Sequence, residues 1–155
     1  MNFYRPLLSI CIPTYNRSSY LDRTICSIVT QKGFNPSTVE IIICDNASTD
    51  NTEEIVRKYT LQYENIHFFK NKQNINDLNF PTVLKKASGL YRKLCNDSLI
   101  FRNGSLKKIL KIIKKYISTQ ESLFYINISK WNLLDRKEIM CSNFDAFLYN
   151  ASFFS

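Results

Sequence analysis

The feature that most constrains the fold of this chain is a regular alternation of short apolar runs with amphipathic segments. The apolar runs at residues 7–12 and 39–44 have the length of buried strands, and the second is rich in β-branched side chains. Further strands are predicted at 66–69, 90–94 and 122–128. Apolar side chains at helical spacing predict helices that begin at Ser18 or Ser19, at Ser48 or Thr49, at Leu78 (to Ser88) and at Ser105. Strands that alternate with helices predict an α/β domain with a doubly wound, mostly parallel sheet.

Polar side chains follow three of the predicted strands at the point where each strand ends. These polar clusters occupy residues 13–17, 45–50 and 96–98. In doubly wound sheets, ligands bind beyond the carboxyl ends of the strands. The coincidence of three polar clusters at that edge therefore predicts a binding site there.

Length and composition favour one ordinary folded domain and argue against several kinds of site. The 155 residues are 45% hydrophobic, which is enough for a single buried core. The three glycines, Gly33, Gly89 and Gly104, lie too far apart to form a glycine-rich dinucleotide loop or a P-loop. Because His67 is the single histidine, neither a zinc site nor Ser-His-Asp machinery is expected, and His67 and Trp131 are assigned to packing.

Positive charge is concentrated in the second half of the chain. The net charge of +8 comes entirely from residues 79–155, because residues 1–78 balance eight Lys and Arg with eight Asp and Glu. A basic half indicates either an anionic partner or a solvated lysine surface. Peripheral contact with an anionic membrane is one interpretation of the lysines in the last predicted helix, which are Lys107, Lys108, Lys111, Lys114 and Lys115. Basic and aromatic residues do not interleave as in known nucleic-acid modules, so no nucleic-acid partner is expected.

Cysteine usage indicates reduced thiols. None of the five cysteines forms a C-x-x-C pair, and two of them, Cys11 and Cys44, stand inside apolar runs. Buried free thiols are typical of cytosolic proteins. The run at 7–12 is too short for a secretory signal or a transmembrane span. We therefore expect a cytoplasmic location, with the inner face of the membrane as an alternative.

Two carboxylates at the predicted edge have chemistry that suits a nucleotide diphosphate. Asp45 directly follows a buried strand and could accept an N–H from a nucleobase or a hydroxyl from a ribose, although a turn or a helix cap is the simpler role. Asp97 lies between Asn96 and Ser98, and these oxygen atoms suit a Mg or Mn ion that bridges a diphosphate. A polar turn is the alternative interpretation of the cluster at 96–98.

Three segments resemble a known family. Residues 8–17, LSICIPTYNR, resemble the opening of the family 2 glycosyltransferases of the GT-A fold. Residues 39–52, VEIIICDNASTDNT, resemble the second signature of that family, and residues 87–98, ASGLYRKLCNDS, resemble the approach to its metal motif. The likeness covers about residues 7–118. It implies a GT-A-like, Rossmann-like sheet that is incomplete at the C-terminus.

The same resemblance implies ligands and residue roles. The donor would be a nucleotide diphosphate sugar, the cofactor a divalent Mn or Mg ion, and the acceptor a polysaccharide, lipid-linked sugar or protein. Asp45 would contact the base, and Asp97 matches a carboxylate of the metal motif. The residues expected to bind the nucleotide sugar are Pro13, Thr14, Tyr15, Arg17, Asp45, Asn46, Asn74 and Asn96.

The chain also departs from the family pattern. Asn76 stands where a glycine is usual, and Asn96 and Ser98 stand where the metal motif has carboxylates. Fewer residues follow Ser98 than the acceptor-binding part of the family needs, so we expect a fragment or a truncated enzyme that is inactive alone. No catalytic base is assigned among the carboxylates that remain, which are Glu121, Asp135, Glu138 and Asp145. The alternative function is a non-catalytic nucleotide- or anion-binding module.

Overall fold

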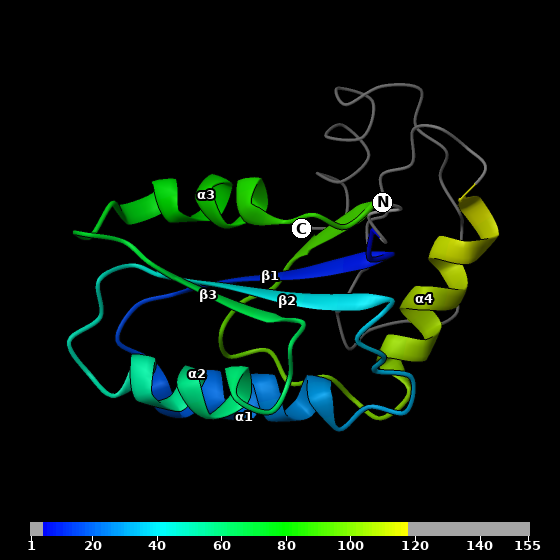
Figure 1. Ribbon diagram of the computed structural model, residues 1–155, viewed down its shortest axis with the longest axis horizontal. Helices are drawn as coiled ribbons and strands as arrows, with labels where there is room; N and C mark the ends of the chain where they lie inside the picture. The colour runs from blue at the N-terminus through cyan, green and yellow to red at the C-terminus, as the bar shows by residue number, and fades with distance from the viewer. Residues whose placement is uncertain (1–4, 118–155) are drawn as a thin grey trace, which may run out of the picture. The chain divides into compact units, whose positions relative to one another are not determined.

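The computed structural model describes residues 5–117 of the chain (Figure 1). The predicted strand at 122–128, Trp131 and the carboxylates considered as catalytic base lie outside these residues. The other predicted strands and helices are present in the predicted order. In chain order the elements are β1 (Leu8–Thr14), α1 (Ser18–Val29), β2 (Val39–Asp45), α2 (Thr52–Thr60), β3 (Ile66–Lys70), the short 3-10 helix η1 (Asn76–Leu78), α3 (Asn79–Lys86), β4 (Tyr91–Leu94) and α4 (Ser105–Tyr116).

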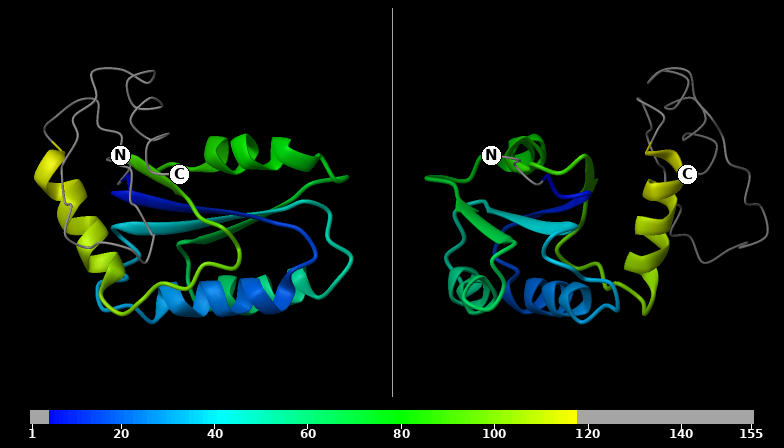
Figure 2. Two further views of the ribbon diagram at one scale, coloured as in Figure 1. Left: turned by 180° about the vertical axis from the view of Figure 1, so that it is seen from behind. Right: turned by 45° about the vertical axis from the view of Figure 1, so that its right-hand side comes forward.

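The strands of the described part form one parallel sheet in the order β3-β2-β1-β4. β1 pairs with both β2 and β4, and β2 pairs with β3. Figures 1 and 2 show α1 and α2 along one face of the sheet and α3 along the other. The doubly wound α/β arrangement predicted from the sequence is therefore confirmed.

The strand order reverses at β1. From β1 the chain steps outward through β2 to β3, and it then returns across the sheet to place β4 on the other side of β1. In open α/β sheets, ligands bind outside the carboxyl ends of the strands at such a reversal. The ends of β1 and β4 are thus the expected position of a site.

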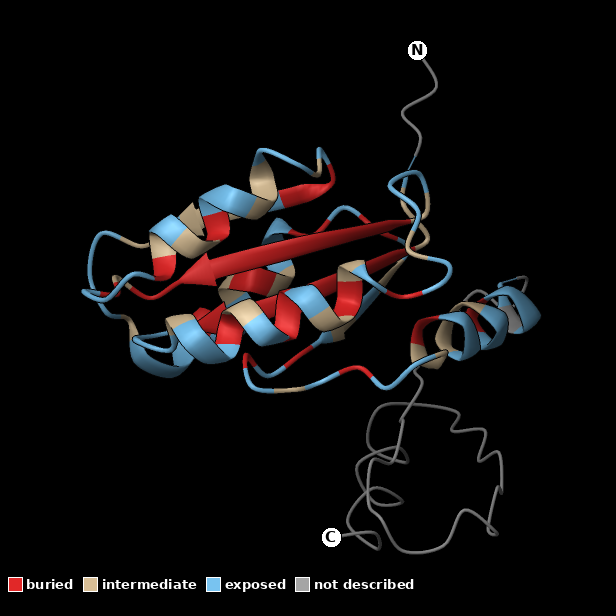
Figure 3. Cartoon of the chain, turned by 90° about the horizontal axis from the view of Figure 1, so that it is seen from below, coloured by how far each residue is buried: buried red, intermediate tan, exposed pale blue. Residues whose placement is uncertain are grey.

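Burial of apolar side chains explains the positions of the central strands. Every residue of β1 and β2 is buried, and these strands appear red in Figure 3. Helix α1 contributes Leu21, Ile25 and Ile28, which share one side of the helix and are fully buried. Val83 of α3 belongs to a buried cluster with Cys11 of β1. Full burial of one such aliphatic side chain stabilises the fold by about 1.5–3 kcal/mol, so the two covered faces of the sheet dominate stability.

Strand β1 continues past the predicted run, through Pro13 to Thr14. The predicted end of this strand at residue 12, before the cluster that starts with Pro13, is wrong, because a proline removes only the hydrogen bond on the side that its nitrogen faces. β4 pairs with β1 only as far as Cys11, whereas Pro13 remains in register with Cys44 of β2. The longer strand carries Thr14 to the edge of the sheet.

One carboxylate, Asp50, accepts backbone hydrogen bonds at the starts of two helices. The serine caps predicted for α1 do not form; instead, the N–H of Ser18 donates to Oδ2 of Asp50 at 2.9 Å. Oδ1 of Asp50 accepts the N–H of Thr52 at 3.1 Å. Helix α2 therefore begins at Thr52 rather than at Ser48 or Thr49 as predicted, because Asp50 is used in the loop before it.

A second buried carboxylate, Glu40, holds together the amino-terminal end of the sheet. Its Oε1 accepts the hydroxyl of Ser9 at 2.5 Å and the N–H groups of Ser88 and Gly89 at 2.7 and 3.1 Å. Burial by itself raises the pKa of Glu40, but these hydrogen bonds outweigh burial and lower the pKa. A Cβ at Gly89 would lie 2.8 Å from the backbone nitrogen of Ser9, so glycine is required there. Helix α3 accordingly ends at Lys86, before the predicted Ser88.

The segment 97–104 connects β4 to α4 and lies along α1. Thr24, Ser27 and Gln31, which share one side of α1, hydrogen-bond to backbone groups of this segment at 2.7, 3.0 and 3.0 Å. The bond from Thr24 ends on the carbonyl oxygen of Asp97. Helix α1 therefore fixes the path of the chain directly after the end of β4.

Helix α4 presents a basic face to solvent. Its sequence contains no Asp or Glu, and its exposed lysines are Lys107, Lys108, Lys111, Lys114 and Lys115. Leu106 and Ile113 of the same helix are buried. Among residues 5–117, no helix is long and apolar enough to cross a membrane.

Candidate functional site

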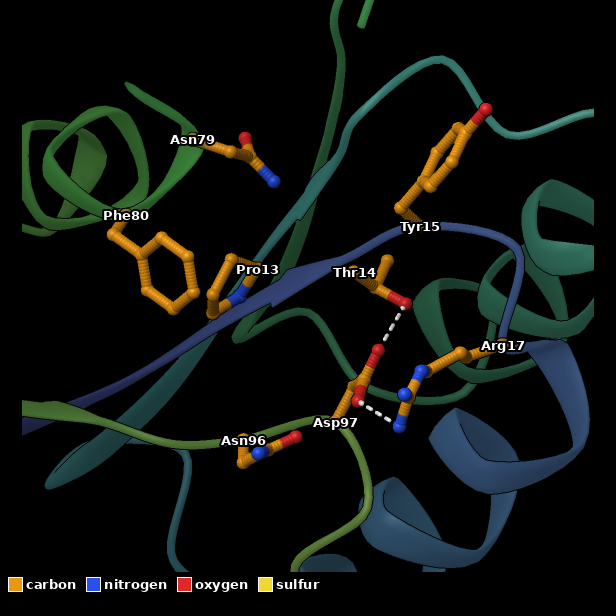
Figure 4. A pocket seen from close by; sticks show the side chains of 8 residues that line it. All are labelled: Pro13, Thr14, Tyr15, Arg17, Asn79, Phe80, Asn96 and Asp97. Atoms are coloured by element: carbon orange, nitrogen blue, oxygen red, sulfur yellow. Dashed lines mark hydrogen bonds and ion pairs between the residues drawn. The ribbon is translucent and has the colours of Figure 1, made fainter. Parts of the chain in front are cut away.

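A cavity of about 330 Å³ lies at the carboxyl ends of β1 and β4, where the strand order reverses. Residues from the polar clusters after both strands line it, and the first turn of α3 adds two more. Six of its lining residues belong to the set predicted from the sequence. The lining residues, drawn in Figure 4, are Pro13, Thr14, Tyr15, Arg17, Asn79, Phe80, Asn96 and Asp97.

A buried hydrogen bond joins the two strand ends inside this cavity. Oγ1 of Thr14 donates to Oδ2 of Asp97 at 2.9 Å (Figure 4). Burial raises the pKa of Asp97, and the hydrogen bond from Thr14 and the charge of Arg17 oppose this rise. The carboxyl group is thus held in position at the wall of the cavity.

Arg17 places a positive charge beside this carboxyl group. Its Nη1 lies 3.8 Å from Oδ1 of Asp97, and the exposed fractions of the two side chains are 53% and 7%. The guanidinium carbon also lies 5.8 Å from the centre of the Tyr20 ring. The guanidinium group is therefore anchored at one side and open to solvent at the other.

The loop that presents Tyr15 and Arg17 is braced by the loop after β2. Between them, Asn16 adopts a left-handed conformation with φ of 51°, which asparagine tolerates better than most residues. Its N–H donates to Oγ of Ser48 at 2.8 Å, and its Oδ1 accepts the N–H of Thr49 at 2.8 Å. The first and second predicted clusters thus support one another across adjacent strands.

Two aromatic side chains line the cavity from different elements. Tyr15 follows β1, and Phe80 lies in the first turn of α3; both are nearly half exposed. Asn79, next to Phe80, is buried and donates to the carbonyl of Cys44 at 2.9 Å, which fixes α3 to the end of β2. The sequence reasoning missed Asn79 and Phe80, since they lie in a predicted helix rather than directly after a strand.

One oxygen atom of Asp45 forms a turn, which is the simpler of the two roles expected for this residue. Oδ1 accepts the N–H of Ser48 at 3.0 Å and also the hydroxyl of Ser48, as in an Asx turn. Oδ2 is buried and has no hydrogen-bond partner among residues 5–117, and Nζ of Lys70 lies 3.9 Å from it. Asp45 does not line the cavity described above. The carboxylate therefore retains one acceptor atom that the turn does not use.

Asn46 lies at the centre of an asparagine network behind the site. Its Nδ2 donates to Oδ1 of Asn74 at 2.7 Å, and its Oδ1 accepts the N–H of Ile75 at 2.9 Å. Asn76 has a φ of 50°, so it occupies the left-handed conformation that explains why a glycine is usual in its place. Asn46 and Asn74 are thus brought together as neighbours, outside the residues that line the cavity.

The side chains of the described part do not fit a metal centre built by the protein. Among residues 5–117, no three His, Cys, Asp or Glu side chains gather where they could hold an ion. Among the described residues, Asp97 is the one carboxylate that lines the cavity, and its two oxygens face Thr14 and Arg17. Mg and Mn ions favour several oxygen ligands from carboxylates, phosphates and water. The donor set here supplies at most one protein carboxylate.

Solved structures show the same fold. TarS from S. aureus superposes with a TM-score of 0.65 at 25% identity, over 71% of this chain and 33% of that chain. The complex of TarS with UDP-GlcNAc gives a TM-score of 0.63, also at 25% identity, over 71% of this chain and 32% of that chain. A mannosyltransferase from Pyrobaculum calidifontis in complex with GDP-Man and Mn²⁺ gives 0.62 at 21% identity, over 70% of this chain and 32% of that chain.

Curated relatives match by sequence. Abequosyltransferase RfbV of Salmonella typhimurium is 36% identical over 137 residues, which are 87% of this chain and 37% of the relative. An uncharacterized glycosyltransferase of Mycoplasma genitalium is 30% identical over 131 residues, which are 83% of this chain and 43% of the relative. The chain thus spans less than half the length of these relatives. Residues 9–118 match the family described as "Glycosyl transferase family 2", and the chain therefore belongs to this family and has its GT-A fold.

Proposed function

We propose that this chain is the donor-binding part of a glycosyltransferase and that its cavity binds a nucleotide diphosphate sugar. The observation that carries the proposal is the cavity itself, because it joins the ends of β1 and β4 at the point where the strand order reverses. TarS, at 25% identity, has been solved in complex with UDP-GlcNAc and with UDP, which supports a donor of this chemical class.

The nucleoside part of the donor has two candidate contacts. Tyr15 offers a half-exposed ring to a nucleobase at the wall of the cavity. Oδ2 of Asp45 is a buried acceptor to which no group of residues 5–117 donates, and an N–H of a base or a ribose hydroxyl would satisfy it. Asn46 and Asn74 support this region from behind through their mutual hydrogen bond.

We propose that the reaction is transfer of the sugar from this donor to an acceptor. The sugar would pass to a sugar or lipid-linked acceptor, as in polysaccharide biosynthesis. The relatives of this chain include an abequosyltransferase and a putative teichuronic acid biosynthesis glycosyltransferase, which supports such an acceptor. Transfer with inversion needs a base within hydrogen-bond reach of the acceptor hydroxyl. Asp97 is engaged by Thr14 and Arg17, so we do not assign it this role.

Calorimetric titration with UDP, GDP, CDP and dTDP, and with a sugar ester of each, tests the proposal. We expect at least one nucleotide to bind with a stoichiometry of one. Asp45→Asn should weaken that binding by about 1–3 kcal/mol, since a charged acceptor is lost. Asp77→Asn, at an exposed aspartate of η1, is the matched control and should bind as the wild type does. Absence of binding for every nucleotide would contradict the proposal.

A non-catalytic binding module is the second candidate function. The described part of the chain brings a single carboxylate to the cavity, which favours this function because donor binding does not require a base. Purified chain incubated with donor and acceptor distinguishes the two: release of nucleotide diphosphate that depends on acceptor indicates a transferase. Binding without such release indicates a module.

We further propose a cytoplasmic location and peripheral contact with anionic lipid. The cysteines of the described part are all free, which supports a reducing compartment. The lysine face of α4 supports attraction to anionic headgroups. Co-sedimentation with vesicles of phosphatidylglycerol, but not of phosphatidylcholine, would support this contact, and binding to neither would contradict it.

A further inference from the structure

We propose that Arg17, rather than a metal ion held by several carboxylates, supplies the positive charge that binds the diphosphate of the donor. This inference rests on the proposed function and specifies how the same cavity holds its ligand. The geometry that supports it is the pairing of Arg17 with Asp97 at the wall of the cavity.

The carboxylate side of this pair lacks the surroundings of a metal ligand. Oδ2 of Asp97 already accepts the hydroxyl of Thr14. The preceding side chain is an amide: Oδ1 of Asn96 accepts the N–H and the hydroxyl of Ser98 at 3.3 and 3.2 Å. Asn96 and Ser98 thus satisfy each other as a neutral polar turn. A divalent metal ion beside Asp97 would have one carboxylate ligand from the described residues, and it would lie next to the positive charge of Arg17.

The guanidinium side of the pair has the properties of a phosphate ligand. Arg17 lines the cavity and is more than half exposed, so an incoming anion can reach it. Its single contact with Asp97 is long, at 3.8 Å, which leaves most of its five N–H donors for phosphate oxygens. The planar fork of guanidinium matches phosphate and can form two parallel hydrogen bonds.

The position of Arg17 is prepared before a ligand arrives. Its neighbour Asn16 is hydrogen-bonded on both sides to Ser48 and Thr49, so the backbone of the loop is braced. Asp97 and the ring of Tyr20 hold the side chain from two directions. A braced cation loses less conformational entropy on binding than a free surface arginine does.

A fixed guanidinium and a bound metal ion differ in one measurable way. A chelator removes a metal ion but leaves arginine in place, and arginine stays charged throughout the accessible pH range. Nucleoside diphosphate binding should therefore persist in excess EDTA. It should weaken as the salt concentration rises, because the exposed charge is screened.

The experiment is a calorimetric titration of the full chain with UDP, GDP, CDP and dTDP, in EDTA and in Mg²⁺ or Mn²⁺. We expect the dissociation constant of the tightest-binding nucleotide to differ by no more than about threefold between the EDTA buffer and the metal buffer. In EDTA, Arg17→Gln should lower its affinity by about 10- to 100-fold, the equivalent of one or two charge-assisted hydrogen bonds. Arg17→Lys keeps the charge but loses the planar fork of N–H donors, so its affinity should lie between that of the wild type and that of Arg17→Gln.

Arg23→Gln is the matched control, because it removes the same charge from an exposed position of α1, the helix that begins directly after Arg17. It should bind as the wild type does. Binding by the wild type only in the presence of metal, or equal affinity of Arg17→Gln and Arg23→Gln, would overturn this inference and leave the proposed function intact. If the wild type binds no nucleotide in either buffer, the proposed function fails and this inference fails with it.

Discussion

The hydroxyl of Thr14, at the end of β1, donates a 2.9 Å hydrogen bond to the carboxyl group of Asp97, in the segment after β4, and it thereby connects two residues that are 83 positions apart in the sequence. Both residues are buried, with 3% and 5% of their surface exposed. The carboxyl group in turn faces the guanidinium of Arg17. The wall of the proposed donor site is thus a short chain of contacts between β1, the start of α1 and the segment after β4.

Replacement of Thr14 by valine tests this connection. Thr14→Val preserves the shape of the side chain but leaves Oδ2 of Asp97 buried without its donor. The free energy of unfolding should therefore fall by about 1–3 kcal/mol, as measured by urea denaturation. Thr14→Ser keeps the hydroxyl and should retain most of the stability. Equal stability of the valine variant and the wild type would show that the bond contributes nothing.

Glu40 predicts a specific dependence of stability on pH. Its folded-state pKa lies below the ordinary value of 4.5, so ionised Glu40 stabilises the fold above that pH. This contribution is lost as the pH falls through the folded-state pKa. Glu40→Gln should therefore be less stable than the wild type by about 2 kcal/mol at pH 7, and the gap should narrow below pH 4.5.

Urea denaturation at a series of pH values measures the difference in the free energy of unfolding between the wild type and Glu40→Gln. Glu64→Gln is the matched control, because Glu64 is exposed and its replacement should change stability by less than about 0.5 kcal/mol. A gap for Glu40→Gln that stays constant from pH 7 to pH 3 would contradict the role of its ionised form.

The order of the elements could be predicted from the sequence because local patterns determine it. The apolar runs of β1 and β2 are buried along their whole length, and such runs read as strands without knowledge of their partners. The rule that strand ends carry ligand sites then placed Thr14 and Asp97 at one edge. The structure agrees, since both line one cavity.

The contacts that hold the site could not be predicted, because each joins residues far apart in the sequence. Glu40 bonds to Ser88, 48 residues away, and nothing local distinguishes it from a solvated strand glutamate. Likewise, nothing local places Asp50 at the start of α1, yet it accepts the N–H of Ser18, which is 32 residues away. Asn79 lines the cavity only because it is tied to the carbonyl of Cys44.

The cysteines should differ sharply in reactivity. Burial raises the pKa of Cys11 and of Cys95 to about 12, and that of Cys44 to about 11, so these thiols are protonated as well as shielded. Cys26 is exposed on α1. Iodoacetamide at pH 8 should label Cys26 in the native protein and the three buried thiols only after denaturant is added. Mass spectrometry of the tryptic peptides measures the extent of labelling at each cysteine. If Cys44 in the native protein were labelled at the same rate as Cys26, its burial would be contradicted.

Binding of a nucleotide diphosphate sugar at the carboxyl ends of β1 and β4 can be mapped residue by residue. The measurement is a ¹H–¹⁵N NMR titration of the labelled chain with the nucleoside diphosphate that binds most tightly. We expect the largest shift changes at the backbone amides of residues 14–17, 45–46 and 96–97. Changes confined to the lysine face of α4, with those amides unmoved, would contradict it and would indicate an anion-binding surface instead.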